Sequence, residues 1–176
     1  MQPPIPTGVP SQEQKRDGFE IVSGNLELVE LTKMLFDQII KPLYGDQTTA
    51  IDRIEKGVDR TTKLLFDGGQ EVGILVIKNR PNSEFADVEA DNAIEIKTLF
   101  VIGADNRPRQ GTGTKLITEA IKMATDAGAD HLAVTVSATK TESLGFFQKH
   151  GFEIKQDMPD KYIKGVTEHL LIKKLK

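Results

Sequence analysis

The sequence contains no cysteine and no long apolar run. Without cysteine the chain has no disulfide, no thiolate nucleophile and no cysteine-ligated metal. No apolar stretch approaches the roughly 20 residues that span a bilayer, so we expect no transmembrane helix. The three histidines, His131, His150 and His169, are not spaced as metal ligands, and we predict no metal site.

The chain also lacks an excess of positive charge. Its 23 lysines and arginines are outnumbered by 26 aspartates and glutamates, which gives a formal net charge of -3. Such a chain has no overall basic field to attract nucleic acid. The missing cysteine and the lack of an apolar signal segment favour the cytoplasm. The sequence is compatible with a homodimer but does not specify one.

What remains is the composition of one globular domain. The 176 residues are 38% hydrophobic and 28% charged, a mixture that supports a core. Residues 1–17 are rich in proline and polar side chains and show no apolar period, so we predict a disordered tail. Residues 18–176 form the predicted single domain.

The spacing of apolar residues predicts an α/β fold with a mixed sheet and helices on both faces. The expected order is β-α-α-β-β-β-α-β-α-β-β. The first helix should end at Pro42 and Gly45, because neither residue continues a helix. Expected strands lie at residues 19–24, 61–67, 71–79, 94–102, 131–138, 152–156 and 168–175, and expected helices at 26–45, 48–60, 114–127 and 141–151.

Two turn signals support these boundaries. The run Gly68-Gly69-Gln70 between two β-rich segments predicts a hairpin. Thr139 and Glu142 have the spacing of a capping box, which predicts the start of the last helix.

The stretch at residues 106–116, "NRPRQGTGTKL", joins an apolar strand to an amphipathic helix. A helix start presents unpaired backbone N–H groups and a partial positive charge, which together bind anions such as phosphate. Gly111 and Gly113 carry no Cβ, so the backbone can approach the phosphate oxygens closely. Arg107 and Arg109 could add charge-assisted hydrogen bonds.

Two known phosphate-binding patterns do not fit this loop. The dinucleotide fingerprint needs a third glycine where Leu116 stands, and the Walker A pattern needs a glycine before its lysine, where Thr114 precedes Lys115. A purely structural alternative is a glycine turn that only lets a helix pack closely on a strand. A further alternative is that this chain is a different kind of nucleotide-phosphate-binding protein that uses the same loop.

The segment Pro108–Gly113 resembles the signature [Q/R]-x-x-G-x-[G/A] of the GNAT superfamily of acetyl-CoA-dependent N-acyltransferases. Pro108 stands where Gln or Arg is usual, and Arg107 is a candidate substitute one residue upstream. Residues 94–102 resemble the fourth strand of that family, residues 141–152 its later helix and Gly-Phe turn, and residues 162–175 its closing strand. Together the similar segments span residues 94–176.

The resemblance implies acetyl-CoA as the cofactor. Its pyrophosphate would bind the backbone of the loop, its pantetheine arm would run beside the fourth strand, and one amide of that strand would polarise the thioester carbonyl. An amine would attack the thioester directly, without an enzyme nucleophile. The implied cofactor-binding residues are Leu99, Phe100, Val101, Arg107, Arg109, Gln110, Gly111, Thr112, Gly113 and Thr114.

Glu95 matches the general-base position of many family members. An attacking ammonium must first lose a proton, and a carboxylate on the fourth strand could accept it. Strict alternation would put Glu95, Lys97, Leu99 and Val101 on one face of that strand. The alternative is that Glu95 is paired with Lys97 or is simply solvated.

The proton donor for the leaving thiolate is less well marked. Phe147 occupies the place of the tyrosine that serves many relatives, and it has no acidic proton. Tyr162, Ser137 and water are the remaining candidates, of which we select Tyr162; a packing or substrate-contact role for Tyr162 is the alternative. The missing tyrosine also leaves open an acyl-CoA-binding sensor or interaction module with little turnover.

The acceptor is expected to be an amine of a small molecule or a peptide. Glu84, Asp87, Glu89 and Asp91 lie in the stretch at residues 81–93, and near the cleft they would favour a cationic amine. The alternative is a solvated acidic loop.

Overall fold

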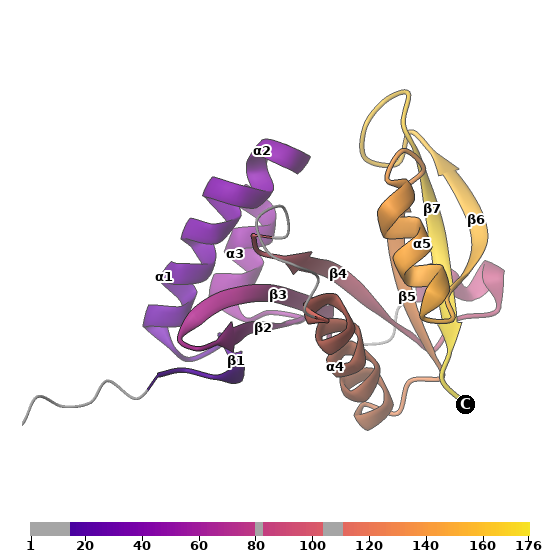
Figure 1. Ribbon diagram of the computed structural model, residues 1–176. Coiled ribbons are helices and arrows are strands. Elements are labelled where there is room, and N and C mark those ends of the chain that lie inside the picture. The colour runs from indigo at the N-terminus through magenta and orange to yellow at the C-terminus, as the bar shows by residue number, and fades with distance from the viewer. Residues whose placement is uncertain (1–14, 80–82, 104–110) are drawn as a thin grey trace, which may run out of the picture.

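The computed structural model describes residues 15–79, 83–103 and 111–176. Residues 1–14 of the expected tail lie outside them. Within the described residues one sheet has the order β1-β2-β3-β4-β5-β7-β6, and β4 and β5 run parallel while the other neighbours are antiparallel (Figure 1). The strands are β1 Gly18–Ile21, β2 Arg60–Asp67, β3 Gln70–Lys78, β4 Ala93–Val101, β5 His131–Ser137, β6 Glu153–Pro159 and β7 Thr167–Lys174.

Helices cover both faces of the sheet, as the sequence predicts. The helices α1 and α3 contribute to one hydrophobic cluster, and α4 and α5 contribute to another on the opposite face. The expected order of helices and strands is confirmed, and a 3₁₀ turn is added before β4. The helical segments are α1 Leu26–Leu35, η1 Phe36–Ile40, α2 Lys41–Tyr44, α3 Thr48–Lys56, η2 Ser83–Val88, α4 Thr112–Asp126 and α5 Thr141–Lys149.

The first helix does not end at Pro42, so that part of the prediction is wrong. It passes through a π-helical turn, η1, and continues as α2, with Pro42 near the start of α2. Proline has no N–H to donate, and its ring collides with the carbonyl four residues earlier in a regular α-helix. The wider π turn just before it accommodates the ring. The helix ends instead at Gly45, whose φ of 80° breaks it.

The two local turn signals have different outcomes. The hairpin is confirmed, with Gly68 and Gly69 both at positive φ (60° and 88°) between β2 and β3. The capping box is wrong, because α5 has no side-chain cap and begins at Thr141. The hydroxyl of Thr139 lies 3.0 Å from that of Ser137 instead, so it is engaged with the end of β5.

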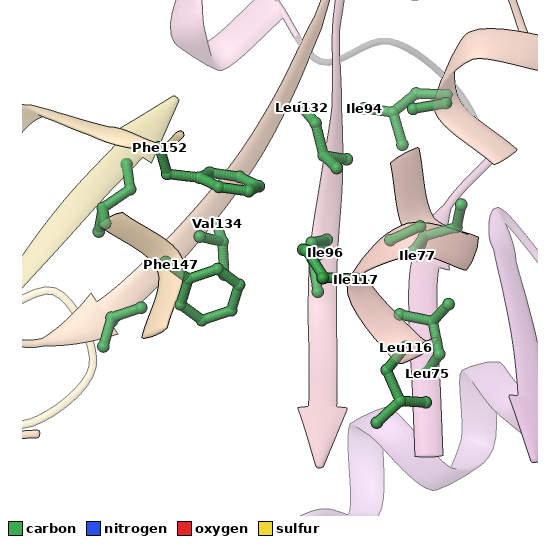
Figure 2. Packing of buried hydrophobic residues seen from close by; sticks show 14 of the residues in the cluster. Leu75, Ile77, Ile94, Ile96, Leu116, Ile117, Leu132, Val134, Phe147 and Phe152 are labelled. Atoms are coloured by element: carbon green, nitrogen blue, oxygen red, sulfur yellow. The ribbon is translucent and has the colours of Figure 1, made fainter. Parts of the chain in front are cut away.

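The cluster beneath α4 and α5 is the largest part of the core. Figure 2 shows Leu116 and Ile117 of α4 over Leu75 of β3 and Ile96 of β4, with Phe147 of α5 farther along the sheet. The apolar stripe of α4 therefore fixes this helix against the middle of the sheet.

A β-bulge interrupts β4 at Lys97. Val76 of β3 is opposite Thr98, and the next residue, Ile77, is opposite Ile96. One step along β3 thus corresponds to two steps along β4, and Lys97 is the extra residue.

The bulge changes which side chains share a face. Leu99 and Val101 pack with Ile96 in the cluster beneath α4, whereas Phe100 packs with the cluster of α1 and α3. Glu95 alternates with Ile96 and therefore lies on the face away from α4. The expectation that Glu95 shares a face with Leu99 and Val101 is wrong for this reason.

The parallel strands β4 and β5 separate towards their ends. Their last paired residues are Ile96 and Val134, although β4 runs on to Val101 and β5 to Ser137. Figure 1 shows the two strands close together at their starts and far apart at their ends. The backbone edge of β4 beyond Ile96 is therefore not paired with β5.

Candidate active site

The helix α4 begins next to the open end of this strand pair. Its N-cap is Gly111, which has a left-handed conformation (φ 73°, ψ 14°). The first intrahelical hydrogen bond runs from the amide of Lys115 to the carbonyl of Gly111, at 2.9 Å. The amides of Thr112, Gly113 and Thr114 precede that bond, so they have no acceptor inside the helix. They form the positive end of the helix dipole.

Two close contacts place this first turn across the mouth of the opening. A Cβ on Gly73 would lie 3.0 Å from Leu116 of α4, and Gly73 is opposite Val101 at the end of β4. A Cβ on Gly113 would lie 3.0 Å from the ring of Phe146 in α5. The turn is thus fixed between the end of β4 on one side and α5 on the other.

The two loop glycines have separate structural reasons. Gly111 has open space around its Cβ position, so its positive φ is what requires glycine there. Gly113 is helical, and it is the approach of Phe146 that excludes a side chain. Close packing is therefore one reason for glycine at position 113. This packing is compatible with phosphate binding, because Phe146 occupies the space of a side chain and does not involve the backbone amide of Gly113. The predicted binding residues Arg107, Arg109 and Gln110 lie outside the described residues.

One of the three histidines, for which the sequence predicts no metal-binding role, lies beside this turn. His150 Nδ1 is 2.8 Å from the carbonyl oxygen of Phe146, and His150 Nε2 is 3.5 Å from the hydroxyl of Thr114. Since a carbonyl only accepts, Nδ1 carries the hydrogen, and neutral Nε2 can accept from Thr114. No sequence spacing marked this contact, because α4 and α5 are brought together only by the fold.

The predicted thioester-binding segment follows the bulge. Leu99, Phe100 and Val101 are half-buried and pair with β3 on one edge. Their other edge faces the opening, because the pairing with β5 has already ended at Ile96. The structure therefore brings this segment and the first turn of α4 to the same opening.

Glu95 is buried and ion-paired. It is 2% exposed, and its carboxylate lies 2.8 Å from the ammonium of Lys97 and 3.5 Å from that of Lys78. It is opposite Ala133, within the paired part of β4 and β5. This geometry favours the paired alternative over a free base. Burial lowers the pKa of nearby Arg60, although neighbouring carboxylates oppose that effect.

The candidates for the proton donor lie in different surroundings. Tyr162, between β6 and β7, is 54% exposed, and its hydroxyl is 3.4 Å from that of Thr135 on β5. Phe147 is buried against the rings of Phe146 and Phe152. Ser137 is engaged by Thr139.

Glu168 of β7 is a buried carboxylate that the sequence did not mark as a candidate. It is 8% exposed, and burial raises the pKa of its carboxyl, although the positive charges of His169 and Lys161 oppose the shift. Glu168 alternates with Leu170 and Ile172 in the sequence, but this pattern marks an inward carboxylate only once β7 is known to lie between β5 and β6.

The acidic stretch before β4 fits the solvated alternative. Asp87 and Asp91 are exposed, while Phe85 and Ala90 turn inwards and pack on the sheet. Glu89 has a φ of 59° at a turn. The side chain of Glu84 lies outside the described part. Among the described residues no group of His, Asp and Glu could hold a metal ion, and no helix there is long and apolar enough to cross a membrane.

Comparison with known proteins agrees with this geometry. The sequence profile of the acetyltransferase (GNAT) family matches residues 30–152, which is more than half of the chain. No curated protein sequence matches significantly.

Solved structures of the same fold cover nearly the whole chain. NAA60 of Arabidopsis thaliana in complex with acetyl-CoA has a TM-score of 0.73 at 15% identity, over 89% of this chain and 97% of that one. The aminoglycoside 6'-N-acetyltransferase from Enterococcus faecium has a TM-score of 0.66 at 14% identity, over 90% and 97%. The acetyltransferase yncA from Salmonella typhimurium with its cofactor acetyl-CoA has a TM-score of 0.67 at 14% identity, over 91% and 95%.

The fold is shared with acetyltransferases that have been solved with acetyl-CoA. With the profile match, the chain belongs to the acetyltransferase (GNAT) family, whose members transfer an acetyl group from acetyl-CoA to an amine.

Proposed function

We propose that this chain binds acetyl-CoA between β4 and β5 and acetylates a primary amine by direct attack on the thioester. The observation that supports this most strongly is the opening itself. Pairing ends at Ile96 and Val134 while both strands continue, and the first turn of α4 lies across the mouth. An extended thioester arm can there bind the free edge of β4, with its phosphates at the helix start.

The cofactor contacts follow from this placement. Backbone amides of the first α4 turn bind the pyrophosphate, and the loop arginines add charge. An amide at the end of β4 stabilises the negative charge that develops on the thioester oxygen. The residues to which we give these roles are Leu99, Phe100, Val101, Arg107, Arg109, Gln110, Gly111, Thr112, Gly113 and Thr114.

Tyr162 is our candidate for protonating the leaving thiolate. Its hydroxyl is exposed and lies over β5 beside the opening, unlike the buried ring of Phe147. For Glu95 the base role remains a hypothesis, and its two ion pairs argue for a structural role instead. A Tyr162→Phe variant should bind acetyl-CoA normally and lose kcat, whereas a loss of acetyl-CoA affinity would contradict the role of proton donor.

The acceptor is a small-molecule or peptide amine in this proposal. One structural neighbour is named for an aminoglycoside, so kanamycin belongs in the amine panel with spermidine and a peptide that has a free N-terminus. A cytoplasmic location and a homodimer are further parts of the proposal, and light scattering of the purified protein tests the latter.

Thermal shift with acetyl-CoA, ATP and NAD tests the cofactor. Acetyl-CoA should raise the melting temperature, since a ligand that binds only the folded state stabilises it. Thiol release from acetyl-CoA with the amine panel then tests turnover. A shift with ATP or NAD but not with acetyl-CoA would overturn the proposal, and cofactor binding without turnover of any amine would favour the sensor alternative.

A double variant of two arginines tests the role of the loop in binding acetyl-CoA. Replacing Arg107 and Arg109 together by Gln should weaken acetyl-CoA binding by about tenfold, because charge-assisted contacts to phosphate are lost. Arg53→Gln is the matched control, since Arg53 is an exposed arginine on α3. Equal affinity in the double variant and the control would remove the arginines from the site.

A further inference from the structure

Glu168 is a buried carboxylate that makes no direct ion pair with the described residues, although His169 and Lys161 place positive charge nearby. It is 8% exposed and makes no hydrogen bond or ion pair with any residue that the structure describes. Among the described residues, the one side-chain polar atom that is both fully buried and unpartnered is His131 Nδ1. The unpartnered oxygens of Glu168 are therefore not fully buried and still touch solvent. A dehydrated but accessible carboxylate binds a cation more strongly than one in open water.

Strand register places Glu168 at the open part of the sheet. It is opposite Ser137, the last residue of β5, whereas the pairing of β4 with β5 ends at Val134. Glu95, in contrast, is opposite Ala133, inside the closed part. Of these two carboxylates, Glu168 is the one that lies level with the opening.

Glu168 also lies on the face of the sheet away from α4. Leu170 and Ile172 of β7 pack there with Ala133, and Glu168 alternates with them. The first turn of α4 lies on the other face, with Val134. If the phosphates of acetyl-CoA occupy the α4 side, the amine has to approach the thioester from the face that Glu168 shares.

Two hydroxyl groups lie on this same face. Thr135 is opposite Leu170, and its hydroxyl is 3.4 Å from the hydroxyl of Tyr162, which comes from the segment between β6 and β7. Met158 of β6 is opposite Glu168 and packs partly into the same apolar cluster. A carboxylate and two hydroxyls, set against apolar side chains, suit an ammonium group on an organic carrier.

We propose that Glu168 binds the ammonium group of the acceptor and takes its proton, with the hydroxyls of Thr135 and Tyr162 beside it. The acceptor is therefore a primary amine that is cationic in solution. This inference rests on the proposed function, because it assumes acetyl-CoA on the α4 side of the opening.

The proton balance is simple. The ammonium transfers one proton to the Glu168 carboxylate, and the neutral nitrogen attacks the thioester carbonyl carbon. A C–N bond forms, the C–S bond breaks, and the second nitrogen proton goes to the leaving thiolate by way of the solvent or the Tyr162 hydroxyl. Glu168 then releases its proton to water, so that the products are the amide, the free thiol and one proton.

The charges around Glu168 are compatible with this role. Burial raises the pKa of Glu168, which makes its carboxylate a better proton acceptor near neutral pH. Lys161 and His169 oppose the shift; His169 Nδ1 is 2.6 Å from Asp157, and the Lys161 ammonium is 3.5 Å from the sulfur of Met158. The facing residues of β5, Thr135 and Ser137, carry no charge.

Glu168→Gln tests the inference, with Glu153→Gln as the control. Glu153 lies on the neighbouring strand β6, is exposed, and is paired with Lys155. Acetyl-CoA binding, followed by thermal shift, should be the same in both variants and in the parent chain. For spermidine and kanamycin, Glu168→Gln should lower kcat/KM by at least about tenfold, because a charge-assisted contact is lost.

Two further readouts separate binding of the ammonium from a structural role. Hydroxylamine is uncharged at neutral pH, so its acetylation should suffer less than that of spermidine. The acidic limb of the pH–rate profile should also disappear in Glu168→Gln. Equal losses for hydroxylamine and spermidine, or an unchanged acidic limb, would overturn the inference while leaving the acetyltransferase proposal intact.

A direct binding measurement covers the case of slow turnover. The chain has two tyrosines and no tryptophan, so in a Tyr44→Phe background all tyrosine fluorescence comes from Tyr162. Spermidine added with CoA should change that emission, and Glu168→Gln should weaken the response. The inference is wrong if none of spermidine, kanamycin and hydroxylamine is acetylated and none changes the fluorescence of Tyr162. This holds even if acetyl-CoA still raises the melting temperature.

Discussion

The ring of Phe146 lies directly against the backbone of Gly113, so that an added Cβ would come within 3.0 Å of the ring. This contact joins the first turn of α4 to α5, across the end of the sheet where β4 and β5 are apart. Phe146 itself is held by Phe147, at 5.3 Å between ring centroids, and by His150, at 4.5 Å. The ring therefore has little freedom to move away.

Gly113→Ala should destabilise the protein by about 1 kcal/mol, because overpacking against a held ring outweighs the gain from replacing a helical glycine. In a Phe146→Leu background the shorter side chain removes the close contact, and the same substitution should be neutral or stabilising. Urea denaturation of the four chains measures both effects. A loss of stability that persists with Leu at position 146 would show that the ring is not the cause.

Gly111→Ala should cost about 1 to 2 kcal/mol, since an alanine in the left-handed conformation is strained. No atom lies within 4 Å of its Cβ position, so the cost is one of backbone conformation alone. Gly145 of α5 is the matched control, because it also has open space but no positive φ, and Gly145→Ala should stabilise by up to about 1 kcal/mol. Thermal or urea denaturation that moved both variants in the same direction would contradict this reasoning.

Glu95→Gln should lower the free energy of unfolding by about 2 kcal/mol. Removing the buried carboxylate leaves the ammonium groups of Lys97 and Lys78 without their partner, and such a loss usually costs more than the pair itself contributes. Glu153→Gln breaks an exposed pair, and it should lower the free energy of unfolding much less than Glu95→Gln does.

The same Glu95 variant separates the two readings of its role. The acidic limb of the pH–rate profile should persist in Glu95→Gln if the residue is structural. Its disappearance, with stability unchanged, would restore Glu95 as the base.

Glu168 should make stability depend on pH in a defined direction. Burial raises the pKa of Glu168 above the ordinary value of a glutamate, so the folded chain holds this proton to higher pH than the unfolded chain does. The contribution of this group is therefore most favourable at low pH and becomes less favourable as the pH rises through the window between the two pKa values. Glu168→Gln has no such proton, so its stability relative to the parent chain should increase across that window and then level off. Urea denaturation between about pH 4 and pH 8 measures the difference, and a constant difference would contradict the assignment.

The parts of the fold that depend on local pattern could be predicted from the sequence. The apolar stripe containing Leu116 and Ile117 gave α4, and Gly68-Gly69 gave the hairpin, because each signal lies within one element and its turn. The path of the first helix past Pro42 could not be predicted. Whether proline ends a helix or is accommodated by a wider turn depends on the packing of the residues before it.

The site could be predicted in outline but not in its charges. The alternative of Glu95 paired with Lys97 came from their spacing, whereas Lys78 enters only through the pairing of β3 with β4. The burial of Glu168 could not be predicted, because a carboxylate on a strand usually faces water. Its burial becomes visible only once β7 lies between β5 and β6.

The extra residue at Lys97 is what keeps Leu99 and Val101 beneath α4. Deleting Lys97 would pair Ile96 and Thr98 with Ile77 and Val76 without a skipped residue, and Leu99, Phe100 and Val101 would keep their present faces. If the strand were instead straightened with Lys97 retained, Phe100 would turn beneath α4, and Leu99 and Val101 would turn towards α1. A substitution that removed the bulge without shortening the chain would therefore exchange the inner and outer surfaces of the segment that faces the thioester.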